Sequence, residues 1–410
     1  MKKLILLFAL FLLLTSCTEN SSEPLVNEDA DMHASLVRED IVIDNSAFAL
    51  DILQKLESSG EENIFFSPLS LSLALSMTMN GAAENTLTQM KEVLHYDELS
   101  IDDLNEQCLH LISSLPEVDP QVELGIANSI WIIYEYPVKE EFIRVNEDYY
   151  LSEVFPNQPF NNQTIIDVNQ WVSDNTEGNI ENLLEEIDEN DRVFLINALY
   201  FSANWKYQFE EENTIAEKFY FQDDQYVMVP MMSCSGLDYT YLFTDDFSAA
   251  RLPYGNGHLA MYVFLPQSTT NLNELLQDLD YETFKEWFTG YEYLSSEMQD
   301  NTAFCLPSFE IDYSILLNDH LKELGMTDAF NVNADFSNMV YESAHPSISY
   351  VKQNTWITVN EAGSTAAAAT IVTMWDSCFE FIVNRPFLYV IRDDRNGTIL
   401  FMGIMNDPSV

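Results

Sequence analysis

The residues of most unusual composition lie in one segment near the C-terminal end, Gly363–Trp375. The segment contains neither a charged residue nor a proline, although charged residues make up 20% of the chain. Its first half is small and its second half is β-branched, so it offers backbone hydrogen bonding rather than side-chain catalysis. Two structures fit this composition. One is a buried helix-to-strand junction, and the other is a loop that slides between two strands, where a charged or bulky side chain would block entry. In an extended chain, one face of the segment carries Ser364, Ala366, Ala368 and Thr370, and the other carries Thr365, Ala367 and Ala369.

A second candidate for chemistry is Cys17, which closes an apolar run at the N-terminus. Lys2 and Lys3 precede the run Leu4–Leu14, which has the shape of a signal peptide and is too short to span a bilayer. Leu14-Thr15-Ser16-Cys17 resembles the lipobox of bacterial lipoproteins, in which the cysteine is lipidated and cleavage occurs just before it. The resemblance implies a signal peptide over 1–16 and a lipid anchor on Cys17. The protein would then lie outside the cytoplasm in a bacterial cell envelope, at the outer membrane. The alternative is an ordinary signal peptide with a chance cysteine.

Motifs of enzymatic catalysis are missing from the sequence. Metalloprotease, P-loop, dinucleotide-binding and nucleophile-elbow patterns do not occur. The six histidines (33, 95, 110, 258, 320 and 345) include no pair at ligand spacing on one predicted helix. We therefore predict no enzyme activity, no metal and no cofactor. A Ser/His/Asp triad assembled from distant positions, as in an envelope hydrolase, is the alternative that sequence alone leaves open.

The charge balance of the 410-residue chain is strongly acidic. Asp and Glu number 67 against 17 Lys and Arg, which gives a net charge of −50. Such a chain repels phosphate backbones, so nucleic-acid binding is excluded. An aromatic content of 13% favours a folded body over disorder. The charge fits either an ordinary solvated surface or a saline habitat, where salt screens the repulsion.

The remaining cysteines do not form a recognisable framework. Cys108, Cys234, Cys305 and Cys378 have spacings that match neither a disulfide scaffold nor a zinc site. We expect no obligatory bridge and buried thiols at the first three positions.

The chain divides into a leader, a tether and a single domain. Residues 17–40 are polar and acidic and read as a flexible tether, whereas residues 41–410 show dense periodicity without a second boundary. Helical spacing dominates the first half of the domain, and β-branched and aromatic strands dominate the second half. Helices and strands do not alternate regularly, which predicts an α+β fold.

Several stretches together resemble the serpin family. Val359–Thr370 (Val-Asn-Glu-Ala-Gly-Ser-Thr-Ala-Ala-Ala-Ala-Thr) looks like the hinge of inhibitory serpins. It is followed at the family distance by Asn384-Arg385-Pro386-Phe387 and Phe401-Met402-Gly403. Further similar stretches are Asn63–Ser70, Asn197–Phe201 with Trp205 and Phe209, Leu252-Pro253-Tyr254, and the set Trp171, Thr176, Gly178 and Ile180. The resemblance covers roughly Asp44 to Pro408.

This resemblance implies a serpin fold of three β-sheets surrounded by eight or nine helices, with an exposed reactive-centre loop. It also implies a monomeric suicide inhibitor, whose partner is a target serine endopeptidase held as a covalent acyl complex, with cysteine endopeptidases as the second class. The cleaved loop inserts into the main sheet, an event known for serpins. The residues that match the hinge are Glu361, Gly363, Ser364, Ala366, Ala367, Ala368, Ala369 and Thr370. The alternative is a non-inhibitory serpin acting as a binding protein on the cell envelope.

The family spacing also places the reactive bond. Counting from Glu361 assigns it to Ser377-Cys378. The loop is shorter than is common, so a bond upstream is the alternative, at Met374-Trp375 or Trp375-Asp376. Ser377 would suit an elastase-like protease and Trp375 a chymotrypsin-like one. No Lys or Arg lies between Glu361 and Val383, which disfavours a trypsin-like target.

Two positions depart from the family pattern. Many serpins have a histidine where this chain has Gln353, in a sheet-closing cluster whose other members match Ser67, Ser70 and Asn197. A glutamine still donates and accepts hydrogen bonds. The family also often has a basic partner for the hinge glutamate, whereas here Leu306-Pro307 leads to Ser308. We therefore expect looser control of loop entry.

Overall fold

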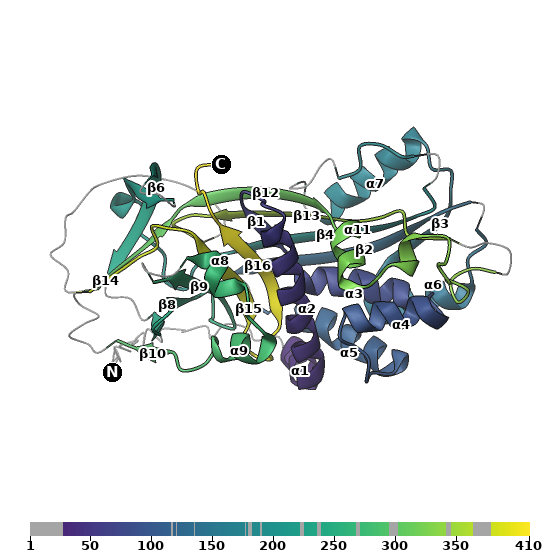
Figure 1. The fold of residues 1–410 in the computed structure, drawn as a ribbon, viewed down its shortest axis with the longest axis horizontal. Helices are drawn as coiled ribbons and strands as arrows, with labels where there is room; N and C mark the ends of the chain where they lie inside the picture. The colour runs from purple at the N-terminus through teal and green to yellow at the C-terminus, as the bar shows by residue number, and fades with distance from the viewer. Residues whose placement is uncertain are drawn as a thin grey trace, which may run out of the picture.

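The fold is a mixed array of helices and strands whose long axis is spanned by one central sheet (Figure 1). The computed structural model describes residues 28–410 except 116–117, 120, 135, 177, 179–182, 189–190, 222–224, 236–238, 268–270, 295–301, 342–345 and 364–378. The described residues form ten α-helices and sixteen strands in three sheets. The predicted α+β class with three sheets is therefore confirmed.

The central sheet has five strands in the order β12-β13-β4-β2-β3. Their bounds are β12 Phe309–Leu316, β13 Tyr350–Val359, β4 Val193–Ala203, β2 Val122–Ile133 and β3 Glu153–Gln158. β13 is antiparallel to β12 on one side and parallel to β4 on the other. β2 is antiparallel to β4 and parallel to β3. The sheet thus contains two parallel contacts, β2–β3 at one edge and β4–β13 in its interior.

Two further sheets flank this centre. The seven-stranded sheet runs β1-β16-β15-β9-β8-β7-β10, and the four-stranded sheet runs β14-β11-β6-β5. The strands of the first are β1 Ile64–Phe66, β7 Thr240–Phe243, β8 Phe247–Pro253, β9 Leu259–Pro266, β10 Glu292–Tyr293, β15 Phe387–Asp393 and β16 Ile399–Met405. Those of the second are β5 Ile215–Tyr220, β6 Tyr226–Ser235, β11 Thr302–Pro307 and β14 Phe379–Ile382. Strands β9, β15 and β16 are almost wholly buried, as their apolar sequences require.

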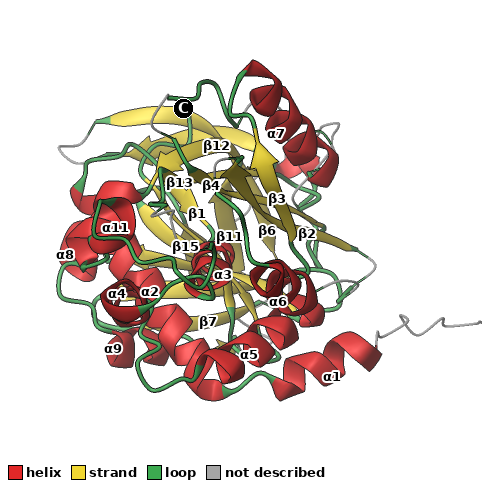
Figure 2. Cartoon of the chain, turned by 90° about the vertical axis from the view of Figure 1, so that its right-hand side faces the viewer, coloured by secondary structure: helices red, strands yellow, loops and turns green. Residues whose placement is uncertain are grey.

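Most helices lie on one side of the central sheet, and α7 lies across the other (Figures 1 and 2). The helices are α1 Glu28–Leu36, α2 Glu39–Ser58, α3 Pro68–Met79, α4 Glu84–Val93, α5 Ile101–Ser114, α6 Glu140–Tyr150, α7 Asn162–Asn175, α8 Leu272–Leu276, α9 Tyr281–Glu286 and α11 Asn318–Leu324. Strand alternation explains the two layers. Phe194 and Ile196 pack in the cluster that contains Trp171 of α7, whereas Val193 and Leu195 belong to the main core.

Helix α3 is the core helix that bears on the central sheet, and its start is fixed by local sequence. Ser67 caps it by accepting a hydrogen bond from the Ser70 N–H, and Pro68 occupies its first turn. Every residue of α3 is buried. This cap places Ser67 and Ser70 under the sheet, where they enter the cluster described below. In the described part of the chain, no helix has the length and apolar character needed to cross a membrane.

The N-terminal stretch differs from the flexible tether expected over residues 17–40. Glu28–Leu36 forms α1, which packs on α5 through the buried Ala30 and Ala34. The two ring nitrogens Nδ1 of His33 and His110 lie 3.0 Å apart. Two alanines at four-residue spacing are too weak an apolar signal to reveal such docking from sequence. The stretch 17–27, which includes Cys17, lies outside the described residues.

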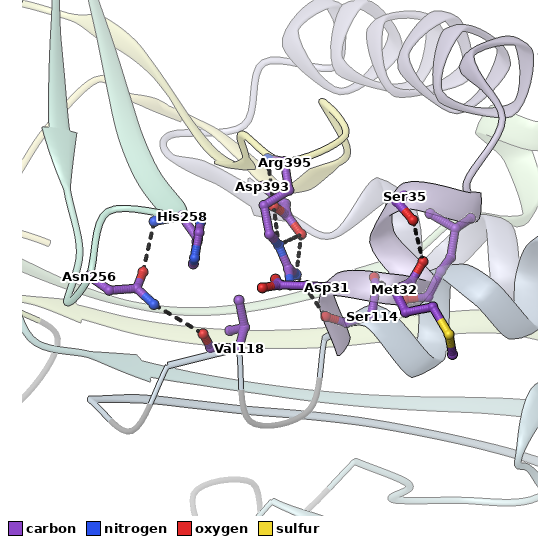
Figure 3. A network of polar contacts seen from close by, with 10 residues as sticks. Asp31, Met32, Ser35, Ser114, Val118, Asn256, His258, Asp393 and Arg395 are labelled. Atoms are coloured by element: carbon purple, nitrogen blue, oxygen red, sulfur yellow. Dashed lines mark hydrogen bonds and ion pairs between the residues drawn. The ribbon is translucent and has the colours of Figure 1, made fainter. Parts of the chain in front are cut away.

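Arg395 joins α1 to the rest of the fold (Figure 3). Its guanidinium lies 2.9 Å from the Asp31 carboxylate of α1 and 2.6 Å from that of Asp393, whose side chain is fully buried. It also donates to the Ser114 carbonyl oxygen at the end of α5, at 2.7 Å. A buried carboxylate needs such a partner, because an unpaired charge inside a protein is costly. Arg395 therefore connects α1, α5 and the β15–β16 turn.

Candidate functional site

In the chain, the uncharged segment singled out from the sequence follows a strand of the central sheet and precedes a strand of the four-stranded sheet. β13 ends at Val359 in the central sheet, and β14 begins at Phe379 in the four-stranded sheet. Residues 364–378 connect them and lie outside the described residues. They include the expected hinge positions Ser364, Ala366, Ala367, Ala368, Ala369 and Thr370, and all three candidate bonds, formed by Met374, Trp375, Asp376, Ser377 and Cys378. The described part of the site comprises the turn Asn360–Gly363, hereafter the hinge turn, and the strands around it.

The parallel contact between β13 and β4 is the structural frame of the site. The paired register runs from Tyr350–Phe194 to Thr355–Leu199, six pairs in all. Past this register, an isolated bridge joins Gly363 to Asn204, just beyond the end of β4. A strand that turned back after Gly363 would be antiparallel to both β13 and β4. Antiparallel pairing is slightly more stable per residue than parallel pairing, so the frame can accept such a strand.

The hinge turn is a compact unit held by its own hydrogen bonds. The Asn360 N–H donates to the Gly363 carbonyl at 2.8 Å, and the Asn360 side-chain oxygen accepts from the Ala362 and Gly363 N–H groups at 3.1 and 3.2 Å. Gly363 has φ +141°, where glycine is favoured. A Cβ atom added there would lie 2.1 Å from the Ala203 carbonyl oxygen. Only glycine therefore allows the turn to approach the end of β4 this closely.

The chain that follows β4 holds the hinge turn from outside. The Trp205 indole donates to the Asn360 carbonyl at 2.8 Å, and the Trp205 N–H donates to the Ala362 carbonyl at 2.9 Å. The Phe209 N–H donates to the Glu361 carbonyl at 2.9 Å. Trp205 is itself fixed by stacking on Tyr254, with ring centroids 4.4 Å apart. The resemblance drew attention to Trp205, Phe209 and Tyr254, but not to their contact with the hinge.

The hinge glutamate has a partner that sequence reasoning missed. The Thr214 hydroxyl donates to the Glu361 carboxylate at 2.5 Å. Thr214 follows the 3₁₀ helix Glu211–Asn213 and immediately precedes β5. The pair is separated by 147 positions in the chain. No local pattern marks an ordinary threonine as the partner of a distant glutamate, so only the tertiary structure could reveal it.

The structure brings together three residues of the expected sheet-closing cluster. The Gln353 side-chain oxygen accepts from the Ser67 N–H at 2.9 Å, and its NH₂ group donates to the Ser67 carbonyl at 3.0 Å. The Ser67 hydroxyl donates to the Leu400 carbonyl at 2.6 Å and accepts from the Ser70 N–H. All three residues are buried. The backbone of Asn197 pairs opposite Gln353 in the β4–β13 register, while its side chain lies outside the described part of the structure.

These contacts have a structural role: they connect β13 to neighbouring elements of the fold. Gln353 forms hydrogen bonds to the Ser67 backbone through both its amide oxygen and its NH₂ group, and these bonds connect β13 to the start of α3. Nearby, the Thr355 hydroxyl donates to the Phe65 carbonyl at 2.6 Å and adds a second tie between β13 and the interior. A primary amide does not titrate, so the hydrogen bonds between Gln353 and Ser67 do not depend on pH. Among the residues that the structure describes, no cluster of metal-ligating side chains occurs.

The described cysteines are unreactive thiols. Cys108, Cys234 and Cys305 are all free. Burial raises the pKa of Cys108 and of Cys305 to about 12 and raises that of Cys234 as well. At neutral pH they are therefore protonated, and a thiol rather than a thiolate is a poor nucleophile and a poor metal ligand. Burial is complete at Cys108, whereas Cys234 and Cys305 are partly exposed.

Comparisons with known proteins agree with the arrangement of strands. A family model described as Serpin (serine protease inhibitor) matches residues 44–408. The chain is 32% identical to human serpin B3 over 390 residues, which are 89% of this chain and 98% of the relative. It is also 32% identical to an uncharacterized serpin-like protein of Methanosarcina acetivorans over 430 residues, 98% of this chain and 97% of the relative.

Solved structures show the same likeness. The thermophilic serpin tengpin in its native state matches with a TM-score of 0.81 and 30% identity, covering 90% of this chain and 95% of that chain. Human thyroxine-binding globulin complexed with thyroxine matches with a TM-score of 0.80, covering 90% and 98%. Its identity of 23% makes this a likeness of fold alone.

The hydrogen bonds between Gln353 and Ser67 should contribute measurably to the stability of the fold. Gln353→Met keeps the length of the side chain but leaves the buried Ser67 N–H without its acceptor. We expect the free energy of unfolding, measured by urea denaturation, to fall by about 2–3 kcal/mol. Ser314→Ala, at an exposed position of the neighbouring strand β12, is the control and should unfold as wild type does. Equal unfolding of Gln353→Met and wild type would contradict the role assigned to the amide.

Proposed function

Since this chain belongs to the serpin family, we propose that it is a suicide inhibitor of endopeptidases, foremost serine endopeptidases. The observation that carries the proposal is the frame formed by β13, the hinge turn and β4. A segment free of charge and proline begins at Gly363, four residues past the end of β13, and Gly363 forms a bridge to Asn204 just beyond β4. Serpins inhibit proteases without acting as enzymes, so the protein would be attacked once and consumed.

The proposed reaction begins as ordinary proteolysis. The active-site hydroxyl of the protease attacks the carbonyl carbon of the reactive bond, the peptide bond breaks, and the new amino terminus leaves with the C-terminal fragment. The carbonyl carbon stays esterified to the protease. Before water hydrolyses this ester, the segment after Gly363 enters between β4 and β13 and carries the protease with it. Distortion of the protease then prevents release.

Magnitudes support insertion as the driving step. Entry opens the six-pair ladder between β4 and β13, but the new strand pairs with both neighbours. The net gain is therefore about one ladder. At ~0.5–1.5 kcal/mol for each backbone hydrogen bond, roughly a dozen residues yield on the order of 10 kcal/mol. That is comparable with the whole stability of a typical domain, and hence enough to distort a bound protease.

The composition of the segment favours an inhibitory serpin over a non-inhibitory one. Ser364, Ala366, Ala368 and Thr370 would all face inward after insertion, and none is charged or large. A non-inhibitory serpin has no need of this restriction. One pocket among the described residues, between α2, α9 and the β15–β16 turn, would suit the alternative, a binding protein. It is lined by Val42, Tyr281, Phe284, Phe288 and Arg392, among others, and has a volume of about 220 Å³. This is below the usual size of ligand pockets, so we rank binding second.

The inward face predicts how loop insertion can be blocked. Ser364→Arg would place a guanidinium inside the closing sheet, where burial of an unpaired charge is strongly unfavourable. We expect this variant to be cleaved by the target protease while forming less than a tenth of the covalent complex, as seen on denaturing gels. Thr365→Arg places the same charge on the opposite face and should trap the protease nearly as well as wild type. Undiminished complex from Ser364→Arg would refute insertion.

The reactive bond determines which protease is trapped. We propose Ser377-Cys378, with Met374-Trp375 and Trp375-Asp376 as alternatives. In the sequence, Cys378 immediately precedes β14, which begins at Phe379, and the two alternative bonds come two and three residues earlier in the chain than the first choice. Mass spectrometry of the peptide released from a protease complex distinguishes them. We expect a fragment that begins at Cys378 and an elastase-like target. A fragment that begins at Trp375 or Asp376 would move the bond upstream and the target to a protease with a large apolar pocket.

We also propose that a lipid on Cys17 anchors the protein outside the cytoplasm of a bacterial envelope, at the outer membrane. The support is the Leu-Thr-Ser-Cys quartet that closes a signal peptide too short to span a bilayer.

The anchor predicts the fate of a Cys17→Ala variant. It should lose most of its membrane association and appear in the soluble fraction, because a protein without acyl chains lacks the two-chain anchoring that stable attachment requires. Fractionation followed by immunoblotting measures this, and Cys108→Ala is a control that should stay with the membranes. The anchor is disproved by a Cys17→Ala variant that remains there at wild-type levels.

A further inference from the structure

Helix α1 is held on the fold by little apolar surface. Among its described side chains, those of Ala30 and Ala34 are buried, and each adds a single methyl group. Met32 and Leu36 remain 50% and 47% exposed. A helix of nine residues is also marginal on its own. Whether α1 stays docked therefore depends strongly on its polar contacts.

One of these contacts joins two imidazole rings. The Nδ1 atoms of His33 on α1 and His110 on α5 lie 3.0 Å apart, and the ring centroids lie 5.3 Å apart. At this distance one nitrogen donates and the other accepts, so a single proton lies between them. The contact therefore suits a pair with no charge or with one charge. Two protonated rings would point two N–H groups at each other and add the repulsion of like charges.

Other charged groups around α1 form pairs of their own. Arg395, in the β15–β16 turn, contacts the carboxylates of Asp31 and Asp393 (Figure 3). Arg38, at the joint between α1 and α2, pairs with Asp40. Because these carboxylates already have arginine partners, they stabilise a second imidazolium less than a free carboxylate would.

The surroundings of His110 disfavour its charged form. Burial lowers the pKa of His110 from its ordinary value, and the nearby charge of His33 lowers it further. Glu106, one helical turn earlier on α5, has the opposite and smaller effect on this pKa. The glutamate is exposed, so water weakens its attraction for a charged ring. The docked arrangement thus favours a neutral His110.

We propose that the contact between His33 and His110 makes the docking of α1 sensitive to pH, so that α1 leaves α5 when both rings become protonated. The trigger is mild acidification, and the moving part is a helix that few apolar contacts retain. Release of α1 leaves α2 as the first packed helix of the described chain and uncovers the face of α5 that carries His110. The physical content of this inference depends neither on protease inhibition nor on the proposed lipid anchor.

The direction of the effect follows from the number of protons bound. The docked pair holds at most one proton at its contact, whereas two free rings can each bind one, with an ordinary histidine pKa of about 6.5. Undocking therefore takes up about one proton. Docking is then favoured fully above this pKa and weakens as the pH falls through it. Between pH 7.5 and pH 5.5, the equilibrium should shift toward release by about tenfold.

Amide hydrogen exchange of the full chain measures release directly. A helix as short as α1 unfolds once it leaves α5, so the amides of residues 32–36 exchange from the released state. The ratio of the intrinsic to the measured rate is the protection factor, and it removes the chemical effect of pH on exchange. We expect the protection factors of these amides to fall about tenfold from pH 7.5 to pH 5.5. A chelator in the buffer prevents a metal ion from bridging the rings, and amides of β16 should keep their protection.

Matched variants identify the groups responsible. His110→Asn places an amide oxygen near the position of Nδ1, where it accepts from His33 in either charge state. We expect its α1 to be protected at pH 7.5 and to change by less than about twofold at pH 5.5, and His33→Asn should behave in the same way. His320→Asn removes an imidazole on α11 and should keep the full change. Asp31→Asn weakens the contact with Arg395, so it should lower protection at both pH values and leave their ratio unchanged.

Two results would overturn the proposal. One is constant protection of α1 in the wild type between pH 7.5 and pH 5.5. The other is a tenfold fall that persists in both His33→Asn and His110→Asn, because another group would then be responsible. A fall that occurs in the wild type, His320→Asn and Asp31→Asn but not in the two pair variants supports it. These measurements involve neither a protease nor a membrane, so failure of the proposed function would leave their result unaffected.

Discussion

The parallel contact between β4 and β13 is the constraint on which the rest of the molecule depends. It is a short ladder, and the structure fastens both of its ends to other elements. Gln353 and Thr355 tie β13 to the chain around Ser67 and Phe65, whereas the hinge turn ties the end of β13 to the chain after β4. The ladder is thus kept closed by contacts that each involve few atoms. Such an arrangement can be stable as a whole and still open cooperatively when one fastening is lost.

Much of this arrangement was predictable from the residues. The uncharged segment, the glycine before it and the motif resemblance located the hinge, and the period of the strands indicated an α+β fold. Gly363 is visible in the sequence as the glycine that precedes a run of small residues, whereas the close approach to the Ala203 carbonyl that requires a glycine there is a tertiary contact. Ser67 and Ser70 were identified through the family resemblance, and the structure places them at the capped start of α3.

The sequence could not reveal which distant side chains form the contacts that hold these elements together. Thr214 and Glu361 are 147 positions apart, and nothing in the composition of either neighbourhood points to the other. The same is true of Asp31 and Arg395, which lie at opposite ends of the chain. The expected weakness of a hinge without a basic residue was a reasonable reading of residues near Ser308. It overlooked a hydroxyl from another part of the fold, since tertiary structure rather than local pattern decides which side chains meet.

The docking of α1 on α5 would limit how far the protein can move from the proposed anchor. With the proposed lipid on Cys17, only the stretch 17–27 separates the membrane from the folded body, and it reaches at most about 40 Å. Without α1 and its ion pair with Arg395, the segment between the lipid and the folded body would extend to residue 38 and be roughly twice as long. On the proposed anchor, so short a connection would confine the proposed inhibitor to a thin layer above the lipid. Proteases that approach this layer would then meet it at a high local concentration, while proteases in the bulk medium would escape it.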